Sequence, residues 1–165
     1  MWSAETVFVC ALALLGRTAQ SFPAVQFIEK VPVGVSPSAE AYVLAEENRV
    51  VLITSAWAFR VAEQAPNRCG QIDALRQIAG VLAHEEWHVR HGSDEEGAYD
   101  AQLTALTSVG AGPMLFSSVM RAKRRVADES RRRDRINQNL SSAPATDPRF
   151  CERCARTRTQ DRKQC

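Results

Sequence analysis

Apolar residues recur with two different periods along this chain, which divides it into a strand-rich first part and a helical second part. Residues 24–31, 41–44 and 50–54 are short runs rich in β-branched and aromatic residues, which is typical of strands. The polar residues 46–49 join the last two runs, so an antiparallel hairpin is predicted there. A short helix is expected at 57–63.

Helical spacing dominates after residue 70. The first long helix is predicted at 71–91, where four apolar residues share one face: Leu75, Ile78, Leu82 and Val89. A second helix is expected from Ser93 to about residue 108, because Ser93 and Glu96 have the spacing of a capping box. A third is expected at 114–133, apolar in its first half and charged in its second.

These elements predict an α+β fold with a small antiparallel sheet or hairpin, a long helix and two further helices. The predicted domain covers residues 22–135, and residues 136–165 form a basic tail that is expected to be disordered. Charge supports this division. Residues 121–165 carry 14 Lys and Arg against 6 Asp and Glu, whereas residues 1–120 have a net charge of −6.

Residues 1–21 have the pattern of a signal peptide and predict export to the periplasm or the exterior. Their apolar run, 7–15, is too short to span a bilayer, and small residues follow it at 19–21. Glu5 stands where a basic residue is expected, so a buried N-terminal helix or strand is the alternative. No other segment is apolar enough to be transmembrane.

Cysteine usage is compatible with export but indicates no function. Cys10 would leave with the signal peptide, and the remaining four are Cys69, Cys151, Cys154 and Cys165. Cys151 and Cys154 form a single CxxC pair, which is weak evidence for a metal site when no second pair is present.

The candidate chemistry lies in the first long helix, which contains every histidine of the chain. His84 and His88 belong to a HExxH pattern, and residues four apart lie on the same face of a helix, so both rings could bind one zinc ion. Glu85 follows the first histidine and could accept a proton from a zinc-bound water.

A catalytic zinc needs a third protein ligand. His91 is a poor candidate, because it lies about 10.5 Å along the helix from His84. Glu95 and Glu96 are the alternatives. Glu95 is favoured because it shares the apolar face of the second helix, whereas Glu96 is engaged in the expected capping box.

Further polar side chains follow Glu95 and could orient the ligands: Tyr99, Asp100 and Gln102. Tyr99 could also donate to a developing oxyanion, which makes it a candidate catalytic residue. Packing in the core is the equally favoured alternative for its ring. Trp87 is expected to form a wall of the core or cleft.

The segment 84–88, followed by 95–99, resembles the gluzincin-type zinc metallopeptidases. These carry HExxH on one helix and a glutamate ligand, in an ExxA-like pattern, on a following helix. The resemblance covers residues 75–106 and implies that Glu85 is the base and that zinc is bound by His84, His88 and Glu95.

The resemblance also implies that an edge strand, here 50–54, holds the substrate in extended form. The chain departs from the family in two ways. Tyr99 stands where many members place an aspartate, and no separate C-terminal domain is expected that would deepen a cleft.

The sequence therefore predicts a zinc-dependent hydrolase, a metallopeptidase that cleaves a peptide or protein substrate. One alternative is a zinc-binding scaffold or sensor without turnover. Another is a protein whose basic tail binds an anionic partner such as nucleic acid, a membrane surface or an acidic protein. Other divalent metals remain alternatives to zinc.

Overall fold

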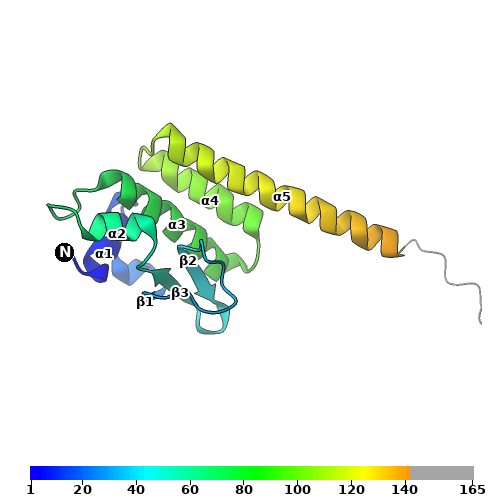
Figure 1. Cartoon of the computed structure of the whole chain (residues 1–165), viewed down its shortest axis with the longest axis horizontal. Coiled ribbons are helices and arrows are strands. Elements are labelled where there is room, and N and C mark those ends of the chain that lie inside the picture. Colours follow the sequence, from blue (N-terminus) through cyan, green and yellow to red (C-terminus); the bar gives the residue numbers. More distant parts are fainter. Residues whose placement is uncertain (142–165) are drawn as a thin grey trace, which may run out of the picture. The chain divides into compact units, whose positions relative to one another are not determined.

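The computed structural model describes residues 1–141, with side chains described to residue 138. It has the predicted α+β fold, a small sheet combined with helices (Figure 1). The elements in chain order are α1 (Ala4–Leu14), η1 (Ala19–Ser21), β1 (Ala24–Ile28), β2 (Ala41–Leu44), η2 (Ala45–Glu47), β3 (Arg49–Ile53), α2 (Trp57–Glu63), α3 (Ile72–His91), α4 (Glu95–Ser108) and α5 (Pro113–Ser141).

The sheet has the strand order β1-β3-β2. β2 and β3 form the predicted antiparallel hairpin, whose connection ends at Asn48 in the left-handed conformation that asparagine tolerates. β1 pairs with β3 in parallel, so the sheet is mixed and not purely antiparallel.

This strand order corrects one prediction. β3 lies in the centre and pairs on both sides, so residues 50–54 cannot supply a free edge. The edge strand next to α3 is β2, whose other side pairs with no strand in the described part of the chain.

The main core lies between the sheet and the helices α1, α2 and α3. The apolar face predicted for α3 is buried in it, with Leu82 fully enclosed. Its largest fully buried side chains include Leu12, Val50, Leu52, Leu75 and Leu82.

Residues 1–21 are part of this core. α1 buries Val7, Phe8 and Leu12 against α2 and α3, and the indole of Trp2 donates a hydrogen bond to the carbonyl of Ala65. The arrangement is the buried N-terminal helix that the sequence left open as an alternative. Export stays a prediction.

Two further bonds join this segment to the rest of the fold. Cys10 forms a disulfide with Cys69, which the sequence did not predict, and Arg17 forms an ion pair with Glu86 of α3. Cleavage after Ser21 would remove one partner from each bond. A chain cleaved at that point therefore cannot contain this disulfide.

α5 is longer than the predicted helix at 114–133. Its apolar first half packs through Val119 against Leu103 and Leu106 of α4. The contacts divide the chain into two units, 1–127 and 128–165, and in the second unit the helix continues to Ser141.

The predicted disordered tail at 136–165 therefore begins within a helix. Residues 142–165, including Cys151, Cys154 and Cys165, lie outside the described residues. In the described part of the chain, no helix has both the length and the apolar character required to cross a membrane.

The buried position of α1 generates a stability test. Leu12→Ala is expected to lower the free energy of unfolding by about 2–5 kcal/mol, because Leu12 is 1% exposed. Val9→Ala on the same helix, where the side chain is 42% exposed, should cost less than about 1 kcal/mol. Urea unfolding followed by circular dichroism measures both. Equal, small effects would contradict the core position of α1.

Candidate metal centre

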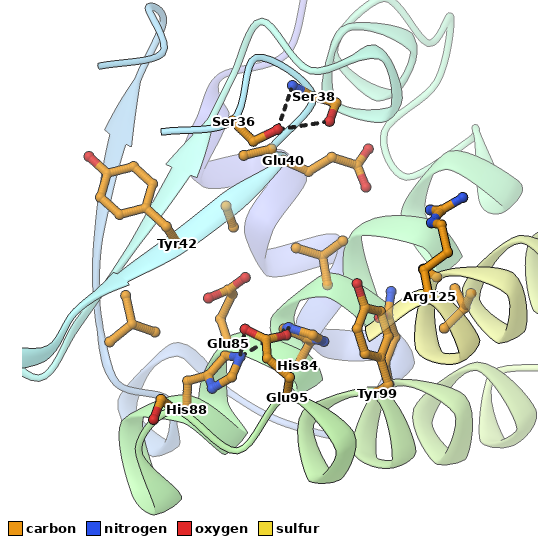
Figure 2. A pocket seen from close by; sticks show the side chains of 18 of the residues that line it. Ser36, Ser38, Glu40, Tyr42, His84, Glu85, His88, Glu95, Tyr99 and Arg125 are labelled. Atoms are coloured by element: carbon orange, nitrogen blue, oxygen red, sulfur yellow. Dashed lines mark hydrogen bonds and ion pairs between the residues drawn. The ribbon is translucent and has the colours of Figure 1, made fainter. Parts of the chain in front are cut away.

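α3 brings the side chains of the two histidines of the HExxH pattern together. The Nε2 atoms of His84 and His88 are 3.1 Å apart, and each side chain is 13% exposed. The rings meet edge to face, with centroids 4.8 Å apart. One turn of helix therefore directs two nitrogen donors at a single point (Figure 2).

Glu95 supplies carboxylate oxygens at the same point. Oε2 lies 3.7 Å from Nε2 of His84, and Oε1 lies 3.5 Å from Nε2 of His88. The side chain is 49% exposed, so it closes the site from the solvent side and is not buried as its position on the apolar face predicted. Glu96 is exposed and does not line the site.

The turn between the two helices makes this approach possible. Gly92 ends α3 at a φ of 73°, a conformation that side chains rarely adopt. α4 then starts at Glu95 and is capped by Asp94, whose carboxylate accepts a hydrogen bond from Gly97 N at 3.0 Å. The predicted capping box of Ser93 and Glu96 is therefore wrong.

The three side chains fit a zinc ion. In a tetrahedral site, the bonds from zinc to nitrogen and oxygen are about 2.0–2.2 Å long. Two ligand atoms then lie about 3.3–3.5 Å apart. The shortest separations here, 3.1, 3.5 and 3.7 Å, bracket that value. One ligand atom from each residue lies within 4.8 Å of the others, and the donor set of two imidazoles and one carboxylate is one that zinc uses in hydrolases.

The second nitrogen of each ring has a different environment. Nδ1 of His88 donates to the carbonyl of Gly92 at 2.7 Å, which leaves its Nε2 lone pair directed at the site. Nδ1 of His84 is buried and has no hydrogen-bond partner of good geometry among the described residues. Gln102, 8% exposed, is the polar side chain that acts on this ring.

Burial keeps His84 neutral. Loss of hydration, and then repulsion from His88, lower the pKa of His84 to about 4, although Gln102 opposes the change. The ring is therefore unprotonated at neutral pH, which is the form that binds a metal.

Glu85 points into the same cavity and forms no ion pair with His84 or His88. It is 7% exposed, and burial together with repulsion from Glu95 raises its pKa to about 8 (Figure 2). A cation bound by Glu95 and the histidines would oppose that rise. The adjacent Glu86 faces the other way, towards Arg17 and Arg90.

Tyr99 lies between the candidate site and the apolar cluster of α4 and α5. Its ring lies edge-on to His84, with centroids 4.7 Å apart, and also packs against the cluster of Leu103, Leu106 and Val119. Burial, and then the carboxylates of Glu95 and Glu85, raise its pKa. The hydroxyl therefore keeps its proton and can act as a donor at the cavity.

Asp100, which was expected to orient the ligands, lies outside the site, and so does His91, the poor ligand candidate. Asp100 forms an ion pair with Lys123 of α5 and does not line the cavity. His91 stacks on Trp87, with centroids 3.9 Å apart, and donates to the Trp87 carbonyl at the end of α3. The Trp87 ring lies against Gly97 of α4 and does not line the cavity.

The site opens into a cavity of about 760 Å³. β2 forms one wall through Ala41, Tyr42 and Val43, and residues 118–125 of α5 contribute to another. A volume of this size is typical of sites that enclose small ligands or parts of larger ones.

Sequence reasoning missed two charged residues of this cavity, Glu40 and Arg125. Glu40 precedes β2 and accepts a hydrogen bond from Gln77 at 2.6 Å. Burial raises its pKa, and the hydrogen bond opposes the rise. Arg125 belongs to the charged half of α5, in which the sequence indicated no site residue.

The spacing of residues along α5 could have indicated that Arg125 lines the cavity. Arg125 lies seven residues after Ser118 and three after Ala122, and these positions share one helical face. No such local signal exists for Glu40, because its place depends on how the hairpin meets α3.

Comparisons with protein-family models, with curated proteins and with solved structures found no match to this chain.

The close packing of α3 and α4 predicts that Gly97 cannot be replaced by a residue with a side chain without loss of stability. A Cβ at Gly97 would lie 2.6 Å from the Trp87 ring and 2.3 Å from the Asp94 carboxylate. Gly97→Ala should therefore lower the free energy of unfolding by about 1–3 kcal/mol. Gly112→Ala, where a Cβ would meet nothing within 4 Å, is the control and should cost less than about 1 kcal/mol. Denaturant unfolding measures the free energy of unfolding of both variants. Equal losses would refute the tight contact at Gly97.

Proposed function

We propose that this protein is a zinc-dependent hydrolase, a metallopeptidase in which His84, His88 and Glu95 bind the metal and Glu85 is the general base. The observation that carries the proposal is the convergence of these three ligand atoms beside an unpaired, buried carboxyl group. The resemblance of the two helical segments to gluzincins agrees with it.

Zinc, when bound, lowers the pKa of a coordinated water to about 7 and polarises a carbonyl. With a metal held by His84, His88 and Glu95, Glu85 would accept one proton from a water molecule while the oxygen of that water adds to the scissile carbonyl carbon. It then delivers that proton to the amine as the C–N bond breaks. Tyr99 donates its hydroxyl proton in a hydrogen bond to the carbonyl oxygen as negative charge develops there.

The proposed substrate is an extended peptide lying along β2. This strand borders the cavity, and its outer edge pairs with no strand in the described residues. Such an edge offers backbone donors and acceptors to an added strand. Residues 41–43 then take the role that residues 50–54 were expected to have.

An oxidising compartment is the proposed setting. The disulfide of Cys10 and Cys69 persists where thiols are not kept reduced, which agrees with export. Because Cys10 belongs to residues 1–21, this proposal requires that these residues remain attached to the domain.

Metal content tests the ligand set. The full chain is expected to hold about one zinc per molecule, a stoichiometry that follows from the one group of converging ligands found in residues 1–138. Glu95→Ala and His84→Ala should each weaken zinc binding by more than about 100-fold, since even partners outside the ligand shell contribute about 10–100-fold. Elemental analysis and competition with a chromogenic chelator measure the affinity.

Glu96→Ala is the matched control, because it removes a neighbouring carboxylate that is exposed and outside the site. It should leave zinc affinity unchanged. Equal losses in Glu95→Ala and Glu96→Ala, or a wild type that takes up no zinc at neutral pH, would refute the proposed site.

Replacement of the base separates an enzyme from a scaffold. Glu85→Gln should keep its zinc and lower kcat by about 100- to 10,000-fold, because the amide cannot accept the proton. Cleavage of labelled casein and of a mixture of internally quenched peptides gives the rates. If the zinc-loaded wild type cuts nothing, the non-catalytic zinc-binding alternative replaces the enzyme. If Glu85→Gln is as active as the wild type, Glu85 is not the base.

A further inference from the structure

The cavity contains one Lys or Arg side chain among the described residues, and the proposed hydrolytic steps do not use it. This is Arg125 of α5. We propose that Arg125 forms a subsite that binds a carboxylate of the substrate. The proposal rests on the hydrolase function proposed above and specifies the class of peptide that the site accepts.

The fold directs this side chain into the cavity. Arg125 follows Ser118 and Ala122 on one face of α5, and all three line the cavity. The packing of Val119 against Leu103 and Leu106 fixes that face relative to α4. In Figure 2 the Arg125 side chain extends beside Tyr99, on the wall that faces Glu40.

Arg125 has no internal counter-ion among the described residues, and its side chain is exposed. Nearby cations differ from it in this respect. Lys123 pairs with Asp100, and Arg90 pairs with Glu86. The Arg125 side chain lies beside Tyr99, whose ring packs on His84 (Figure 2). Its positive charge therefore stands at the wall of the candidate metal centre.

The chemistry of the guanidinium selects the ligand. Arginine presents parallel N–H donors that match the two oxygens of a carboxylate, and the pair is stronger in a partly enclosed cavity than in water. The acid on the opposite wall, Glu40, accepts the amide of Gln77 and forms no ion pair with Arg125. An incoming carboxylate therefore finds the guanidinium available.

A peptide offers a carboxylate from two sources, its C-terminus or the side chain of Asp or Glu. Two series of dansylated peptides distinguish them. The first compares a free C-terminus with a C-terminal amide, in Ala and Leu peptides of three to six residues. The second uses amidated hexapeptides with a single Glu or Gln at each position in turn.

Peptide binding is measured as the change in dansyl fluorescence, with the zinc-loaded full chain. This chain carries Glu85→Gln, so that the peptides stay intact. Cleavage by the chain that retains Glu85 is followed separately as kcat/KM. Arg125→Gln is expected to weaken binding of the carboxylate peptides by about tenfold or more and to change the neutral peptides less than about twofold. Arg124→Gln removes the same charge from an adjacent exposed residue that does not line the cavity, and should change neither.

A preference confined to free C-termini assigns the subsite to the terminal carboxylate, and a preference for Glu over Gln at one position assigns it to a side chain. Either preference supports the proposal if Arg125→Gln abolishes that preference. The proposal is overturned if the wild-type cavity binds carboxylate and neutral peptides equally or binds neither, or if Arg125→Gln and Arg124→Gln act alike. Absence of cleavage with a retained carboxylate preference would instead refute only the hydrolase function.

Discussion

The close approach of α3 to α4 is the constraint on which the candidate site depends. Gly80 and Gly97 lie where the helices touch, and a Cβ at Gly80 would be 2.8 Å from Leu106. The turn at Gly92 reverses the chain within three residues, and its carbonyl also holds the ring of His88. A wider separation of the helices would move Glu95 out of reach of both histidines.

The sequence predicted most of the site because its ligands are close along the chain. Helical spacing placed His84 and His88 on one face, and the short connection placed Glu95 opposite them. The N-cap of α4 was misjudged by one residue, because Ser93 and Asp94 are both good caps and composition does not choose between them. The actual start leaves Glu95 half exposed in the first turn.

Long-range features were harder to predict, for a physical reason in each case. An apolar run such as 7–15 suits a signal peptide or a buried helix equally, because both environments remove it from water. The sheet order depends on where β1 pairs, and no local pattern encodes that parallel pairing with β3. Consequently the edge strand was assigned to the wrong half of the hairpin.

The two adjacent acids of the HExxH pattern show how neighbours, and not residue type, divide their roles. Glu86 is buried and satisfied by Arg17 and Arg90, so it supports the helix and links it to the N-terminal segment. Glu85, about 100° further round α3, receives no cation from the described residues and lies in the cavity. Because an unpaired buried carboxylate is unfavourable, the cation best placed to relieve it is one bound beside it by His84, His88 and Glu95. The same ion would lower the pKa of Glu85 towards the range in which it can accept a proton.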